Sequence, residues 1–149
     1  MTKFHLPVSW RRTGLLLAVL LLLAVPGSAR PSQVQVARQF LLAVLRGDYT
    51  AAYQLLAPEA QATLKADGFR AAARPLYEQG QRRGTPFDLY KLGYRIDEAN
   101  TVRNFYSFMF KSDTLAARPV VQLDVTFRDS TATRILTFGL IPAPQTPRK

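Results

Sequence analysis

The side chains of this sequence that could take part in chemistry are carboxylates and tyrosines. The chain holds no cysteine and a single histidine, His5. Histidine is the commonest general acid–base residue, and histidine and cysteine are the usual zinc ligands. No Ser-His-Asp or Cys-His arrangement can be built from residue 30 onward, and no glycine-rich loop has a phosphate-binding spacing. We therefore expect no metal ion and no cofactor.

Two aspartates can be assigned roles from their surroundings. Asp48 follows Gly47 at the expected start of a helix, where capping explains it. Asp124 alternates with apolar residues in a predicted strand, so we expect it to point outward, away from the core. The inner sheet face would then be hydrocarbon: Val121, Leu123, Val125, Phe127, Leu136, Phe138 and Leu140. Because no acid or base can be placed in a pocket, the sequence favours a protein that is not an enzyme.

Aromatic side chains are the candidates for a ligand site. Binding pockets are mostly apolar with a few polar groups, which fits tyrosines on buried faces. The alternative is that these residues are core aromatics whose hydroxyl groups reach the surface. The residues that we predict to bind a small apolar ligand are Tyr53, Tyr77, Phe108 and Phe138.

The N-terminus has the order of basic, apolar and small residues that is typical of a secretory signal peptide. An uncharged run extends from Gly14 to Val25, and small residues follow up to Ala29. A bilayer span needs about 20 apolar residues, whereas signal peptides have runs of about 10–14. We predict a signal peptide over residues 1–29, cleaved near Ala29, and a secreted or periplasmic protein without a stable membrane anchor. The alternative is an uncleaved N-terminal anchor.

Apolar residues at helical spacing predict three N-terminal helices. The first opens with a capping box formed by Ser32–Gln35 and ends at Gly47. The second is short and starts at Asp48, and Pro58 begins a further turn or two. The third runs from about Asp67 to Gln79.

Period-two patterns predict four strands after the helices. Helices followed by an antiparallel meander indicate an α+β domain over residues 30–142, with the helices packed on one face of a curved sheet. Residues 143–149 are proline-rich and read as a disordered tail. The predicted strands are Phe87–Asp97, Val102–Lys111, Val120–Arg128 and Thr133–Ile141.

One stretch of the helical half resembles a known family. It reads RGDYTAAYQLLAPE, and its matching residues are Gly47, Asp48, Ala51, Ala52, Tyr53, Leu55, Leu56, Pro58 and Glu59. The chain is similar, over about residues 34–141, to exported bacterial members of unknown function in the nuclear-transport-factor-two-like superfamily. The resemblance implies a cone-like α+β fold. The chain departs from that fold in lacking an early β-hairpin between helices.

That superfamily also contains enzymes, which supplies a rival function. Its ketosteroid isomerases and SnoaL-like cyclases place an aspartate, and often a tyrosine or histidine, in the cone. An aspartate base with tyrosine and protonated aspartate as oxyanion donors is the isomerase arrangement. A buried Asp or Glu facing a closed cavity would favour this chemistry, whereas a hydrocarbon interior favours binding.

The run NFYSFMF, residues 104–110, is apolar at positions on both faces of its strand. A sheet covered on one face should alternate polar and apolar residues. Such a run is explained if a second subunit, a partner protein or a lipid-like ligand covers the other face. We favour a homodimer, and the alternative is a central strand that is buried on both sides within one chain.

The basic balance of the chain does not indicate nucleic-acid binding. The formal net charge is +10, and residues 1–29 hold three of the positive charges, so the mature chain would carry +7. Arginines cluster between Arg70 and Arg83, but Glu78 interrupts them and aromatic residues are not interleaved with them. A solvated helix face or an anionic envelope surface explains this charge better.

The sequence thus predicts an exported, non-enzymatic domain of the bacterial envelope that binds a small ligand or a partner. The first alternative is a small-molecule isomerase or cyclase of the type described above. The second alternative is an adaptor that docks another protein on the outer face of its sheet.

The predicted cleavage can be tested by intact mass spectrometry of the protein exported with its own N-terminal segment. We expect a mass that begins at Arg30, because small residues close the apolar run at Ala29. The full-length mass would instead make the run from Gly14 to Val25 an anchor.

Overall fold

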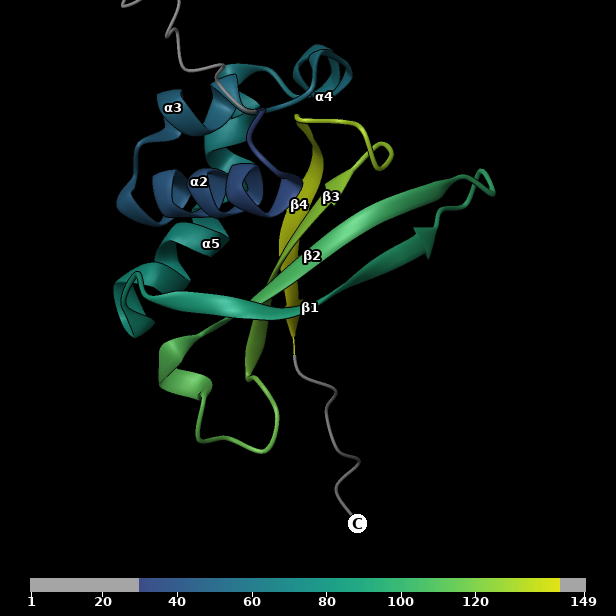
Figure 1. The fold of residues 1–149 in the computed structure, drawn as a ribbon. Coiled ribbons are helices and arrows are strands. Elements are labelled where there is room, and N and C mark those ends of the chain that lie inside the picture. The colour runs from purple at the N-terminus through teal and green to yellow at the C-terminus, as the bar shows by residue number, and fades with distance from the viewer. Residues whose placement is uncertain (1–29, 143–149) are drawn as a thin grey trace, which may run out of the picture. The chain divides into compact units, whose positions relative to one another are not determined.

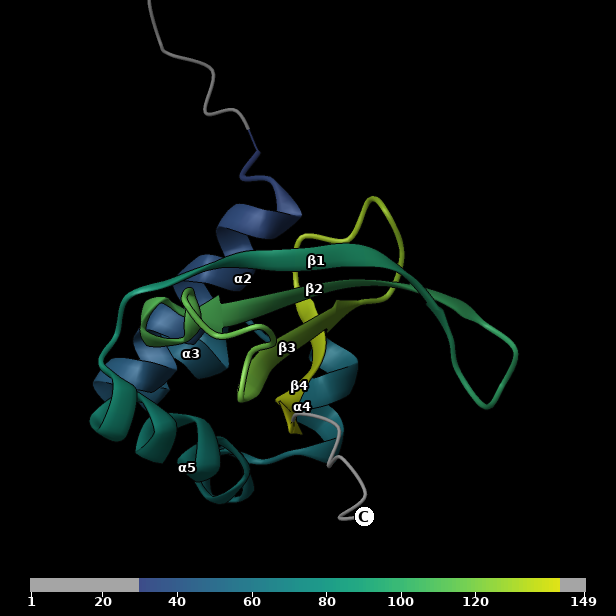
Figure 2. The ribbon, with the colours of Figure 1, turned by 90° about the horizontal axis from the view of Figure 1, so that it is seen from below.

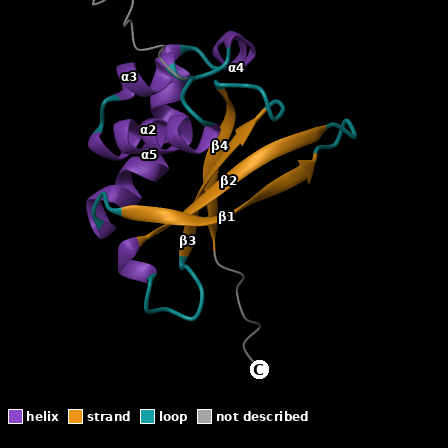
Figure 3. Cartoon of the chain, in the orientation of Figure 1, coloured by secondary structure: helices purple, strands orange, loops and turns teal. Residues whose placement is uncertain are grey.

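The structure, a computed structural model, describes residues 30–142. The predicted signal peptide and the predicted C-terminal tail lie outside these residues. The described chain is α+β, as the sequence predicts, with a group of helices on one side and a twisted sheet on the other (Figures 1 and 3).

Within residues 30–142, four helices precede the sheet, where the sequence predicts three helices and a turn or two from Pro58. The additional one, α4, begins at Pro58 because Ala57 has an extended backbone that separates it from α3. Proline suits the first turn of a helix, since its missing N–H has no partner there. The helices are α2 (Gln33–Arg46), α3 (Tyr49–Gln54), α4 (Pro58–Thr63) and α5 (Ala66–Arg83).

Both predicted ends of α2 and the predicted start of α3 are confirmed, whereas α5 runs to Arg83, four residues beyond the predicted end. Ser32 caps α2, and the Gln35 side chain accepts a hydrogen bond from the Ser32 N–H at 2.8 Å, which completes the capping box. Gly47 ends α2 with φ +80°, a left-handed conformation that glycine adopts without strain. The Asp48 carboxylate then accepts the Ala51 N–H at 3.0 Å and caps α3.

The sheet is an antiparallel meander in the order β1-β2-β3-β4. It is open, so β1 and β4 are edge strands, and β1 crosses the direction of β4 in Figure 1. Seen from below, the paired β1 and β2 extend well beyond the helices (Figure 2). The strands are β1 (Phe87–Ile96), β2 (Val102–Phe110), β3 (Val121–Phe127) and β4 (Ile135–Pro142), with a short 3₁₀ turn at Lys111–Asp113 after β2.

The core lies between α2, α5 and the sheet. Phe40 and Leu41 of α2 are completely buried, as are Phe108 and Leu123 of the sheet. Phe40 packs against Phe69 of α5 with ring centroids 6.1 Å apart. Burial of a large apolar side chain contributes about 1.5–3 kcal/mol, so this cluster supplies much of the stability of the domain.

Strand β3 departs from the predicted pattern, because all of its seven residues are buried. Asp124 lies on the face opposite Leu123 and Val125, as alternation predicts, but it is not exposed to solvent. Asp124 therefore points away from the core, as predicted, but it is buried on that outer face. Both neighbours of β3 contribute side chains to that face, and Arg95 from β1 reaches across it to bond Asp124.

The run at 104–110 forms most of β2, a central strand paired with β1 on one side and β3 on the other. Ser107, Phe108 and Phe110 are buried within the single chain. The face that carries Phe108 and Phe110 is thus covered by the chain itself, whereas Phe105 and Met109 on the opposite face are only partly buried.

Close packing of α2 on α5 requires glycine at position 80. A Cβ there would lie 2.9 Å from Leu45 Cδ2 and 3.3 Å from Leu45 Cβ. We expect Gly80→Val to lower the free energy of unfolding by about 1–3 kcal/mol, because overpacking forces neighbouring side chains apart. The matched control is Gly139→Val, since a Cβ at Gly139 meets nothing within 4 Å. Urea denaturation measures both, and equal effects would contradict this account of the packing.

Candidate functional site

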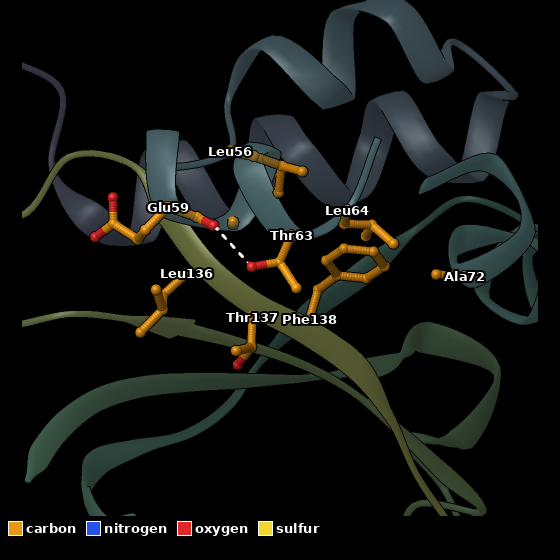
Figure 4. Close-up of a pocket in the computed structure, with 9 residues that line it drawn as sticks. Leu56, Glu59, Thr63, Leu64, Ala72, Leu136, Thr137 and Phe138 are labelled. Atoms are coloured by element: carbon orange, nitrogen blue, oxygen red, sulfur yellow. Dashed lines mark hydrogen bonds between the residues drawn. The ribbon is translucent and has the colours of Figure 1, made fainter. Parts of the chain in front are cut away.

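An apolar groove between α4, α5 and β4 is the best candidate for a binding site (Figure 4). Its volume is about 490 Å³, within the range of small-molecule pockets, about 300–1,000 Å³. Its lining residues come from the α3–α4 link, α4, α5 and β4: Leu56, Glu59, Ala60, Thr63, Leu64, Ala72, Leu136, Thr137 and Phe138.

Backbone hydrogen bonds hold one end of the groove. Leu56 and Ile135 form a parallel bridge between the link that precedes α4 and the start of β4. The Ala57 N–H donates to the Ile135 carbonyl at 2.7 Å, and the Ile135 N–H donates to the Leu55 carbonyl at 3.0 Å. Because these bonds join α4 to the edge strand, the groove is a feature of the folded backbone and does not depend on one side-chain rotamer.

The polar groups of the groove are few and lie at its margin. In Figure 4 the Phe138 ring points toward Thr63 and Leu64, and the Glu59 carboxylate points away from it. The Thr63 hydroxyl donates to the Glu59 carbonyl at 3.2 Å. The Glu59 side chain is 44% exposed and lies 3.6 Å from Arg128. The arrangement therefore offers an apolar interior with a carboxylate and threonine hydroxyls at the rim.

The four residues predicted to bind a ligand do not share one pocket. Phe138 lines the groove, whereas Phe108 is completely buried in the core. Tyr53 packs on Phe69, with ring centroids 5.4 Å apart, and does not line the groove. Its carbonyl accepts a hydrogen bond from the Gln61 side chain at 2.8 Å, which ties α3 to α4.

Tyr77 lies in a separate hollow between α3 and α5. Besides Tyr77, the residues that line this hollow include Tyr49, Arg70 and Arg74. Burial raises the pKa of Tyr49, and Tyr77 raises it further, while Arg70 and Arg74 oppose the shift. The two tyrosines are 6.2 Å apart between ring centroids, so they support each other where α3 meets α5.

Two buried carboxylates lie outside the groove, and each is paired with an arginine. Asp113 accepts from Arg83 at 2.6 Å and from the Val120 N–H at 3.0 Å. These bonds tie the end of α5 to the loop between β2 and β3. A buried carboxylate that is neutralised in this way has a structural role.

Asp124 forms a polar cluster on the outer face of the sheet. Arg95 donates to its two carboxylate oxygens at 2.9 and 3.3 Å, and the buried Ser107 hydroxyl donates at 2.6 Å. The bond to Asp124 raises the pKa of Arg95, against the effect of burial. The guanidinium also lies 4.6 Å from the Phe105 ring centroid. The cluster therefore fastens β1, β2 and β3 together.

Neither a metal-binding cluster nor a membrane-spanning helix is found in residues 30–142. Within residues 30–142, no three His, Cys, Asp or Glu side chains are grouped so that they could hold a metal ion. No helix of that same range is long and apolar enough to cross a membrane.

Comparisons with protein-family models, curated proteins and solved structures find no match to this chain. The resemblance to the nuclear-transport-factor-two-like superfamily therefore stays a prediction. The candidate site is defined by the geometry of this chain alone.

Most residues of the groove were not identified from the sequence. Leu56, Leu64 and Ala72 belong to three separate segments, and each reads as an ordinary residue of an amphipathic helix. The available signal was Pro58, which starts a helix shortly before a second one. When one short helix follows another closely, the chain must change direction between them. This change of direction leaves space beside the edge strand β4.

The structural role of Asp124 can be tested by substitution. We expect Asp124→Ala to lower the free energy of unfolding by about 2 kcal/mol, because the Ser107 hydroxyl loses a charged partner inside the protein. Arg95 is 43% exposed, so it can turn to water, which keeps the cost below that of a fully buried pair.

The matched control is Glu78→Ala, which breaks the exposed Arg74–Glu78 pair of α5 and should cost below about 0.5 kcal/mol. Urea denaturation of both variants gives the comparison. A negligible cost for Asp124→Ala would contradict the structural role.

Proposed function

We propose that this chain is an exported, non-catalytic domain that binds a small apolar molecule in the groove between α4, α5 and β4. The observation that carries the proposal is the groove itself, which combines pocket-like volume with walls of leucine, alanine and phenylalanine. Apolar walls with a few polar groups are typical of small-molecule sites. The carboxylate of Glu59 at the rim would favour a ligand whose apolar body ends in a hydrogen-bond donor.

The position of the acidic groups supports binding over isomerase or cyclase chemistry. Catalytic carboxylates are prepared by burial or by nearby charge within the substrate pocket. The buried Asp113 and Asp124 both lie outside the groove lining and are paired with arginines. Glu59, which does line the groove, is not buried.

The outer face of the sheet supports the adaptor alternative less well than the groove supports ligand binding. Its centre is occupied by the polar cluster around Asp124, whose charges are already paired. A protein that docked there would have to cover or displace Arg95. It would gain no new ion pair, because Arg95 is already bonded to Asp124. The groove is thus the better candidate for recognition.

A groove-filling variant tests the proposal with N-phenyl-1-naphthylamine, a neutral apolar fluorophore, as the probe. Ala72 is exposed and lines the groove, so Ala72→Phe adds bulk to the site without disturbing the core. We expect the affinity for the probe to fall about tenfold or more, equal to about 1.4 kcal/mol. Fluorescence titration gives the dissociation constants.

Ala62→Phe is the matched control, because Ala62 is an exposed residue of α4 that does not line the groove. Its affinity for the probe should equal that of the natural chain. Absence of binding to the natural chain, or equal losses in both variants, would overturn the proposal. Native mass spectrometry of the exported protein would further show whether a small molecule is carried from the cell.

A further inference from the structure

The paired strands β1 and β2 extend beyond the helices (Figure 2). A row of apolar side chains is exposed in this part of the hairpin. Leu92, Tyr94 and Ile96 alternate along β1 and therefore point to one face of the hairpin. Val102 lies directly opposite Ile96 and shares that face. These residues are exposed by 60, 72, 65 and 52%, respectively. We call this row of four residues the hairpin face.

The hairpin face carries no charge. Its flanking partners on β2 are Asn104, opposite Tyr94, and Tyr106, opposite Leu92. The charged residues of both strands, such as Lys91 and Arg95, alternate onto the opposite face. A surface of this composition offers nothing to an acidic or basic partner, whether protein or nucleic acid.

The exposed area is large for a chain of this size. One aromatic side chain covers about 150–250 Å², so the four residues present on the order of 400 Å² of apolar surface. The largest apolar patch on a typical monomer is about 300–600 Å² and is often functional. Water contact with this patch is unfavourable, and burial of it would release free energy.

We propose that the hairpin face binds the same face of a second copy of this chain. Two-fold association brings a patch against itself, and an uncharged patch does so without placing like charges together. Two copies would bury on the order of 800 Å² through these residues, and about 1,000 Å² with their surroundings, the low end of specific interfaces. The result is a weak, concentration-dependent dimer.

The contact is between faces and not between strand edges. The register of β1 shifts between Leu89 and Lys91, which marks a bulge in this edge strand. Bulges and lysines on an edge hinder the addition of another strand. The apolar face beyond the bulge remains available.

The charge of the chain sets the expected salt dependence. Each copy is strongly basic, so two copies repel each other at long range. Added salt screens this repulsion while leaving the uncharged contact intact. The dimer should therefore tighten when NaCl is raised, whereas a contact between opposite charges would weaken.

Sedimentation velocity of the protein expressed with its own N-terminal segment tests the proposal directly. We expect a reversible dimer that is populated at concentrations up to about 200 µM and has a dissociation constant on the micromolar scale. Tyr94→Asp and Ile96→Asp should each weaken it by at least about tenfold. The matched control is Leu115→Asp, because Leu115 is fully exposed in the loop after β2, away from the hairpin face.

The absence of cysteine allows a second readout. A single Tyr94→Cys variant should be joined into dimers by a short bis-maleimide, and Leu115→Cys should be joined far less. Monomer at all concentrations, or equal effects at positions 94 and 115, would overturn the proposal. The three charged variants leave the core intact, and circular dichroism verifies that they fold.

Discussion

The contact of Phe138 with two helices is the interaction on which the rest of the structure depends. Its ring lies 5.1 Å from that of Phe40 in α2 and 5.4 Å from that of Phe69 in α5. These edge and tilted contacts join the last strand to both long helices, and such aromatic pairs contribute beyond their buried area. Because Phe138 also lines the groove, the same side chain that closes the core forms the wall of the candidate site.

The local elements of this fold were predictable because their signals lie within a few residues of each other. The Ser32 capping box, the left-handed Gly47 and the Asp48 cap each depend on neighbours three or four positions away. The strand boundaries follow from alternation and differ from the predicted ones by two residues at most. The segment that starts at Pro58 was predicted as a turn or two and forms the separate helix α4. The end of α5 was missed by four residues, because Gly80 lies inside the helix and does not end it.

The burial of Asp124 and the shape of the groove could not be predicted in the same way. A polar residue in an alternating strand normally faces water, and nothing near Asp124 in the sequence identifies Arg95, two strands away, as its partner. The groove likewise depends on the path of the chain between Leu56 and Leu64. Tyr77 and Phe108 looked like ligand-binding aromatics, but the structure places Tyr77 between α3 and α5 and Phe108 in the core.

The twist of the sheet explains why one small domain has two separate apolar surfaces. The helices cover the sheet only in part, near β3 and β4, and this coverage creates the groove beside the edge strand. The same twist carries β1 and β2 beyond the helices (Figure 2). Tyr94 and its neighbours are exposed there. Ligand binding and self-association would therefore use different ends of the sheet and need not compete.

Hydrogen–deuterium exchange of the full chain, with and without N-phenyl-1-naphthylamine, tests the central claim of a groove that binds apolar molecules most directly. We expect the probe to slow exchange in residues 56–64 and 136–138, which line the groove, and to leave exchange in β1 and β2 unchanged. Protection that appears only in other segments, or no protection at saturating probe, would contradict it.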